Sequence, residues 1–105
     1  MSTFDDRETA FEAKFAHDEE MLFNANARRN KQLGLWAAAL KGETIEAARA
    51  YARSVVKSDL AKAGHEDVVE MVCGYLTGVA DESTVRAKMD ELMVAAKAEI
   101  MDEHS

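Results

Sequence analysis

The most constraining feature of this sequence is that it contains no proline, although nineteen of its 105 residues are alanine. Proline is the strongest breaker of an α-helix, and alanine enters a helix at the lowest cost in free energy. With 48% hydrophobic residues, the chain can bury one core without a disulfide or a metal ion. We therefore expect a single all-α domain.

In a chain without proline, glycines are the main signals for the ends of helices. Gly42, Gly64 and Gly78 each follow a segment in which hydrophobic residues recur at three- and four-residue steps, as in a helix with one buried face. Residues suited to cap the next helices are Thr44 and either Asp81 or Ser83. Because the intervening loops are short, we predict a small antiparallel four-helix bundle.

The hydrophobic period also predicts which side chains face the core. They are Leu22, Leu33, Trp36, Ala37 and Leu40 in the first stretch, Ile45, Ala48, Ala52, Val55 and Val56 in the second, Val68, Val69, Val72, Tyr75, Leu76 and Val79 in the third, and Val85, Met89, Leu92, Ala96 and Ile100 in the fourth. Gly34 lies within the first stretch, where it is either a site of close packing or a weak point of the helix.

The net charge of −7 opposes binding of the whole surface to nucleic acid or to an anionic membrane, although a local basic patch remains possible. Cys73 is the only cysteine, which excludes an internal disulfide and favours a reducing compartment. The N-terminus is acidic where a signal peptide would be basic, and the apolar stretch near Leu35–Leu40 is too short to span a membrane. We therefore expect a cytoplasmic protein that binds no nucleic acid and does not insert into a membrane.

The first twenty residues differ in charge from those that follow. Residues 1–20 contain seven acidic and two basic side chains, whereas residues 21–42 contain four basic side chains and no acidic one. Asp5 and Glu8 have the spacing of a capping box, which predicts the start of a helix. The apolar residues on one side of this helix are Phe4, Phe11, Phe15 and Leu22. This apolar side either packs on the bundle or is available to another protein.

Common enzyme motifs are absent from the sequence, which has no glycine-rich phosphate loop, no Gly-x-Ser-x-Gly elbow and no dinucleotide fingerprint. His65 near Glu66 and Glu70 lacks the second histidine of a helical zinc site, so we expect it to be a solvated residue beside a helix start. Cys73 lies among apolar residues, where a buried, unreactive thiol is expected. We therefore predict no enzymatic activity, no cofactor and no metal site.

Three cations lie close together in the run Arg28-Arg29-Asn30-Lys31. The run is too short for a nucleic-acid interface, and the net charge of the chain opposes one. These cations could instead pair with the acidic residues 1–20, contact acids on a protein partner, or form an ordinary solvated helix face. Arg28, Arg29 and Lys31 are therefore candidates for a secondary partner contact.

Several sequence runs closely resemble the zeta-subunit family of ATPase inhibitors, which occur with the F-type ATP synthase of alphaproteobacteria. The most specific runs are Thr3–Glu8 (TFDDRE), Ala10–Asp18 (AFEAKFAHD), Ala27–Lys31 (ARRNK) and Leu33–Ala38 (LGLWAA). Two further runs, Ala87–Leu92 (AKMDEL) and Ala96–Met101 (AKAEIM), extend the resemblance over nearly the whole chain.

The resemblance implies a helical bundle, residues 21–105, that anchors a mobile inhibitory segment, residues 1–20. This segment would become helical and insert at the catalytic interface between the alpha and beta subunits, with the gamma subunit as a further contact, and so block ATP hydrolysis. The implied contact residues are Phe4, Asp5, Asp6, Arg7, Phe11, Lys14, Phe15 and His17. The protein would then lie at the inner membrane only through the synthase. The alternative is a helical binding module or adaptor for a small ligand or another protein.

Overall fold

The structure is a computed structural model that describes residues 19–61 and 65–104. Within these residues the chain forms four α-helices and no β-strand, which confirms the predicted all-α bundle. The helices are α2 (Glu19–Leu40), α3 (Ile45–Ala61), α4 (Glu66–Tyr75) and α5 (Glu82–His104). Gly64 and the helix start predicted at Asp5 lie outside the described residues.

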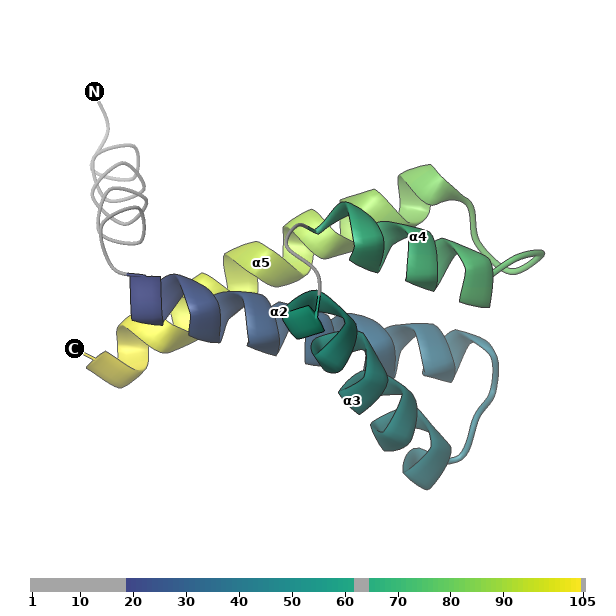
Figure 1. The fold of residues 1–105 in the computed structure, drawn as a ribbon, viewed down its shortest axis with the longest axis horizontal. Coiled ribbons are helices and arrows are strands. Elements are labelled where there is room, and N and C mark those ends of the chain that lie inside the picture. Colours follow the sequence, from purple (N-terminus) through teal and green to yellow (C-terminus); the bar gives the residue numbers. More distant parts are fainter. Residues whose placement is uncertain (1–18, 62–64, 105) are drawn as a thin grey trace.

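The long helices α2 and α5 lie side by side and antiparallel, and α3 and α4 pack against one half of this pair (Figure 1). The main core forms where all four helices meet, and its largest buried residues include Leu33, Val55, Val72, Leu76 and Val85. A smaller cluster joins the start of α2 to the end of α5 and consists of Met21, Ala25, Ala96 and Ile100. The two ends of the described chain therefore lie together, where the start of α2 packs against the end of α5.

The predicted turn and cap residues lie between the described helices, although α4 ends at Tyr75, three residues before Gly78. Gly42 and Gly78 have φ angles of 75° and 81°, in the left-handed region that residues with a side chain rarely adopt. The Thr44 hydroxyl accepts a hydrogen bond of 3.1 Å from the backbone N–H of Ala47. At the start of α5, the carboxylate of Asp81 accepts a hydrogen bond of 2.9 Å from the backbone N–H of Thr84. The N-cap of α5 is therefore Asp81 and not Ser83.

Three residues predicted to face the core are instead exposed. Ile45, Val79 and Leu40 have exposed fractions of 72%, 49% and 46%. Ile45 and Leu40 are terminal residues of α3 and α2, and Val79 lies in the turn after α4. A hydrophobic period identifies the buried face of a helix, but it does not show how far the neighbouring helix extends along that face. The prediction was therefore wrong at these three positions, and the predicted residues in the helix interiors are buried or partly buried.

Gly34 is a site of close packing between α2 and α3, the first of the two alternatives for this residue. It is buried, and a Cβ atom at this position would lie 2.6 Å from the Cα atom of Ala52. That distance is shorter than a van der Waals contact, and the neighbouring atom belongs to the backbone. The two helices therefore approach each other more closely at Gly34 than any other residue type allows.

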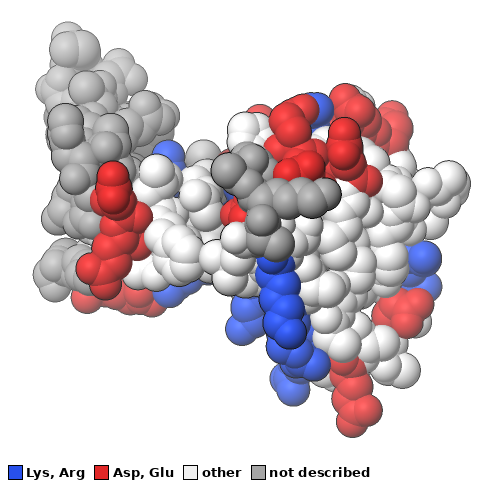
Figure 2. Space-filling view, in the orientation of Figure 1, with Lys and Arg blue, Asp and Glu red and all other residues white. Residues whose placement is uncertain are grey.

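Charged side chains gather by sign on the surface. In Figure 2, acidic side chains gather along the upper edge, over α4 and the start of α5, and basic side chains gather below the middle, on the side of α3.

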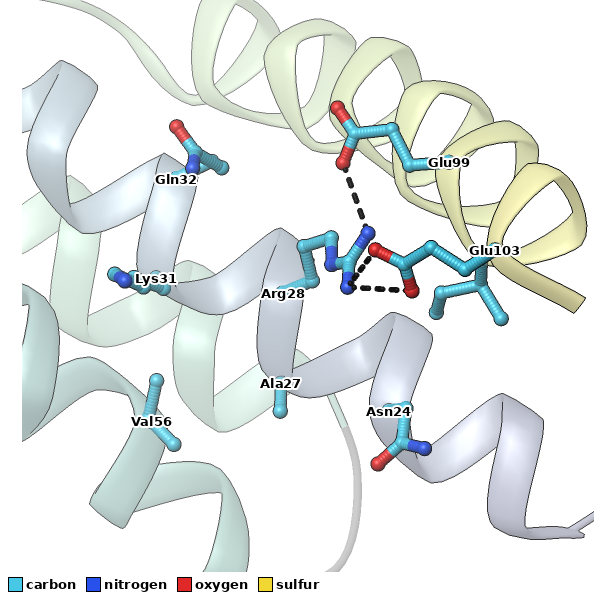
Figure 3. A pocket seen from close by; sticks show the side chains of 9 residues that line it. Asn24, Ala27, Arg28, Lys31, Gln32, Val56, Glu99 and Glu103 are labelled. Carbon is cyan, nitrogen blue, oxygen red and sulfur yellow. Dashed lines mark hydrogen bonds and ion pairs between the residues drawn. The ribbon is translucent and has the colours of Figure 1, made fainter.

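Ion pairs connect α5 to α2. The guanidinium of Arg28 donates to Glu99 at 3.2 Å and to both carboxylate oxygens of Glu103 at 3.0 and 3.1 Å (Figure 3).

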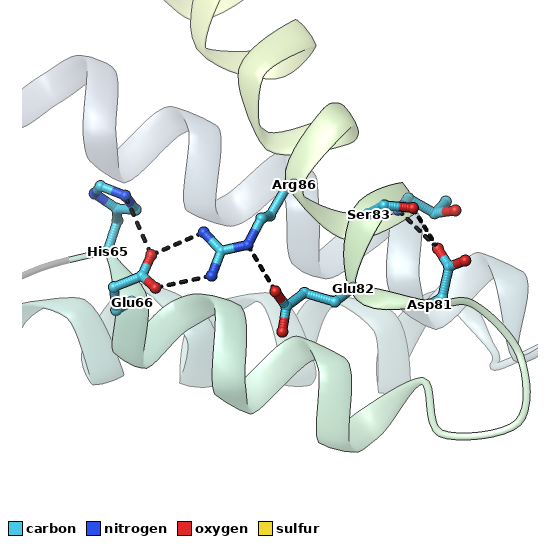
Figure 4. Close-up of polar contacts among 7 residues, drawn as sticks. His65, Glu66, Asp81, Glu82, Ser83 and Arg86 are labelled. Carbon is cyan, nitrogen blue, oxygen red and sulfur yellow. Dashed lines mark hydrogen bonds and ion pairs between the residues drawn. The ribbon is translucent and has the colours of Figure 1, made fainter.

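A second ion-pair cluster ties α4 to α5 (Figure 4). Arg86 of α5 donates two hydrogen bonds, of 2.8 and 2.9 Å, to the carboxylate of Glu66 at the start of α4, and a third of 3.1 Å to Glu82. The hydrogen bonds from Arg86 hold the pKa of Glu66 below its ordinary value of 4.5. The cluster therefore favours the folded chain while Glu66 is ionised.

A pair of glycine substitutions should change stability in opposite directions. Gly34→Ala places its methyl group against the backbone of α3, so it should lower the free energy of unfolding by about 1–3 kcal/mol. In Gly74→Ala, the added Cβ atom in α4 has no neighbouring atom within 4 Å. The better helix propensity of alanine should therefore raise the free energy of unfolding by up to about 1 kcal/mol. Thermal or urea unfolding measures both, and equal effects of the two variants would contradict the close packing at Gly34.

The variant Glu66→Gln should be less stable than the wild type at neutral pH but not in acid. Because folding lowers the pKa of Glu66, its ion pair stabilises the fold above about pH 4.5, and this contribution is lost as the pH falls through the lower pKa of the folded state. Urea unfolding at pH 7 and at pH 3 measures the difference between the two proteins. Glu70→Gln, which alters an exposed acid of the same helix, is the control. A difference for Glu66→Gln that persists at pH 3 would show that the ion pair is not its cause.

Candidate functional site

Two sets of partner-binding residues are predicted from the sequence, and the structure describes only the second. The inhibitory set, from Phe4 to His17, lies outside the described residues, and its roles stay predictions. The second set, Arg28, Arg29 and Lys31, lies on α2. Successive residues of a helix point about 100° apart, so these three side chains face different surroundings although they are neighbours in the sequence.

Arg29 is buried within the bundle and takes part in a hydrogen-bond network. Its side chain is buried between helices, and its Nε–H donates a hydrogen bond of 3.1 Å to the amide oxygen of Asn30. Asn30 is fully buried and donates a hydrogen bond of 2.9 Å to Asp59 of α3. Burial lowers the pKa of Arg29, and the carboxylates of Asp59 and Asp90 oppose this shift. The network therefore joins α2 to α3 and compensates the charge of a buried guanidinium.

Arg28 and Lys31 lie at the surface but differ in their partners. Arg28 is held by Glu99 and Glu103, and the two carboxylates outweigh the effect of burial and raise its pKa. Lys31 is exposed and forms no ion pair or hydrogen bond with any residue in 19–61 or 65–104. Of the three predicted cations, Lys31 is therefore the one whose charge the described fold leaves available to a partner.

Lys31 lies at the border of two surface hollows. The first has a volume of about 460 Å³ and contains the Arg28, Glu99 and Glu103 side chains seen in Figure 3. The second, of about 540 Å³, lies between α2 and α3. We call this second hollow the α2–α3 groove, and its lining residues are Lys31, Gln32, Leu35, Arg49, Ala52, Arg53, Val56 and Lys57.

Three of the four cations in the α2–α3 groove were not predicted from the sequence as site residues. Arg49, Arg53 and Lys57 are spaced four residues apart, so a helix over this region places them along one side. That spacing was a usable signal. What the sequence does not show is that Lys31, from another helix, lies across the groove from them.

His65 and Cys73 were the described residues considered for metal binding or thiol chemistry. In 19–61 and 65–104, no group of three or more histidine, cysteine or acidic residues could hold a metal ion. His65 is exposed, and its Nε2 atom lies 3.5 Å from the Oε2 atom of Glu66. The carboxylate of Glu66 also forms an ion pair with Arg86. Cys73 is half-buried, and burial raises the pKa of its thiol, which disfavours the reactive thiolate. None of the described helices is long and apolar enough to cross a membrane.

Comparisons with known proteins identify the family of the chain. No curated protein matches the sequence significantly. A solution NMR structure of a protein with 53% sequence identity matches with a TM-score of 0.71, over 79% of this chain and 98% of the other. The family model described as ATPase inhibitor subunit zeta matches residues 1–99, which is nearly the whole sequence. The chain therefore belongs to the ATPase inhibitor subunit zeta family.

Proposed function

We propose that this protein inhibits ATP hydrolysis by the F-type ATP synthase by inserting residues 1–20 as a helix at the catalytic interface between the alpha and beta subunits. In this proposal residues 21–105 form the bundle that anchors the segment, and the gamma subunit is a further contact. The protein acts as a regulator and not as an enzyme, and it lies wherever the catalytic sector of the synthase lies.

The observation that carries the proposal is the family match, because it begins at residue 1 and extends to residue 99. It thus includes both the proposed inhibitory segment and most of the bundle. The family description names an inhibitor of an ATPase.

The described bundle can serve as an anchor for the segment. Helix α2 begins at Glu19, so the proposed segment continues directly into a helix of the bundle. Close to this junction, Met21 and Ala25 of α2 are buried against Ala96 and Ile100 of α5. The Arg28 ion pairs with Glu99 and Glu103 lie on the next turn of the same contact. A partner that holds residues 1–20 is therefore connected to a packed and ion-paired region.

Within the segment, the phenylalanines should contribute most of the binding free energy. Full burial of a phenylalanine gains about 1.5–3 kcal/mol, whereas an exposed ion pair contributes about 0–1 kcal/mol and a helix cap about 1 kcal/mol. Phe11 and Phe15 are four residues apart, and Phe4 precedes Phe11 by one heptad. A hydrophobic groove of the partner can accept all three from one side of a helix.

Deletion of residues 1–20 should abolish inhibition and leave the bundle folded. The buried residues of both core clusters lie between Met21 and Ile100, so the deletion removes none of them. Titration of the ATPase activity of the purified catalytic sector measures inhibition, and circular dichroism with a thermal melt measures folding. A truncated protein that inhibits as well as the full chain would place the inhibitory segment elsewhere.

Substitution of Phe11→Ala or Phe15→Ala should weaken inhibition by roughly 5- to 150-fold, which corresponds to about 1–3 kcal/mol of lost burial. The effect should be smaller for Asp5→Asn, because asparagine still caps a helix. The measurement is the same ATPase titration, with a thermal melt of each variant.

Val94→Ala is the matched control for the phenylalanine variants, because it shortens an apolar side chain of α5 that is 71% exposed. It should inhibit as the wild type does. If both phenylalanine variants inhibit normally, or if they lose activity only because the bundle unfolds, the phenylalanines do not have the role proposed here. If the wild-type chain itself leaves ATP hydrolysis unchanged, the alternative of a helical binding module is favoured.

A further inference from the structure

The described part of the chain contains ten lysine and arginine residues. Six of them interact with other residues: Arg28, Arg29, Lys41, Arg86, Lys88 and Lys97. The other four form no ion pair or side-chain hydrogen bond with a described residue, and all four line the α2–α3 groove. In a chain with a net charge of −7, the cations that the described fold leaves unpaired are thus concentrated in one place.

The described fold does not explain this arrangement. Arg49, Arg53 and Lys57 follow one another at four-residue steps on α3, and like charges at this spacing repel one another and destabilise a helix. Side chains elsewhere on the surface show the opposite arrangement, for example the pair Glu82 and Arg86 at the same spacing on α5. The three cations of α3 therefore oppose helix stability, which favours a role in binding.

The shape and lining of the α2–α3 groove indicate the kind of ligand. No acidic residue lines it, and its apolar residues are Leu35, Ala52 and Val56. From Arg49 to Lys57 the cations extend over about 12 Å of helix, at 1.5 Å per residue. A compact phosphate requires donors that converge on one point. Carboxylates one or two turns apart on a helix match an extended row of cations, and apolar residues beside them would contact the groove floor.

We propose that the α2–α3 groove binds an acidic, amphipathic helical segment of the catalytic sector of the F-type ATP synthase, as a second contact separate from residues 1–20. This inference rests on the proposed function and adds to it an attachment site on the bundle. The contact holds the bundle on the enzyme and so raises the local concentration of the inhibitory segment at its target.

The test compares two full-length double variants that change the net charge equally. Arg49→Gln with Arg53→Gln removes two cations from the groove, and Ala95→Glu with Ala98→Glu adds two acids at exposed positions of α5. Each changes the net charge by −2. Binding to the purified catalytic sector is measured by interferometry at low and at high salt, beside the ATPase titration and a thermal melt.

The groove variant should bind about 3- to 30-fold more weakly than the wild type at low salt, as expected for the loss of two ion pairs. The difference should shrink at high salt, because exposed charges are screened. Its melting temperature should be equal or slightly higher, since two repulsive contacts on α3 are weakened. The α5 variant should bind as the wild type does.

If the wild type inhibits ATP hydrolysis, the proposed function holds, and three results would still contradict binding of an acidic partner helix in the groove. Equal binding by the two variants would show that the groove makes no contact with the enzyme. Tighter inhibition by the groove variant would show that the groove holds the acidic residues 1–20 of its own chain. If inorganic phosphate at constant ionic strength removes the difference between wild type and groove variant, the groove is a phosphate site. A wild type that does not inhibit would instead contradict the proposed function.

Discussion

The close contact between Gly34 of α2 and Ala52 of α3 sets the helix separation on which much of the structure depends. Because no side chain lies between the two backbones there, the amide of Asn30 can reach Asp59, and this contact helps to compensate the buried Arg29. The same separation brings Lys31 to the groove lined by the cations of α3. One glycine thus affects both the stability of the bundle and the surface that we propose as a binding site.

Most of the fold could be predicted from the sequence because the signals that determine it are local. A left-handed glycine follows α2 at Gly42 and lies in the turn after α4 at Gly78, and a side-chain oxygen caps the following helix at Thr44 and at Asp81. Each signal involves residues only a few positions apart. Burial at the helix ends was not predictable in this way, because the exposure of Ile45 depends on where another helix ends.

The candidate site could be predicted only in part, because its contacts join residues distant in the sequence. Arg28 pairs with Glu99 and Glu103, which are 71 and 75 positions away. A run of basic residues shows that cations are close together, but not that Arg28 and Arg29 have acids of their own chain beside them. The roles of Phe11 and Phe15 rest on the family resemblance and on energetic comparison, since these residues lie outside the described part.

The position of α2 has a mechanical consequence for an inhibitor of a rotary enzyme. In the proposed complex, a force that pulls on residues 1–20 reaches the bundle through the start of α2 and acts along this helix, which contacts all three other described helices. Because α5 runs antiparallel beside α2, such a force shears a long row of side-chain contacts at once and does not peel them apart one by one. The arrangement therefore distributes the load, and the anchor should yield later than a bundle pulled from a peripheral helix.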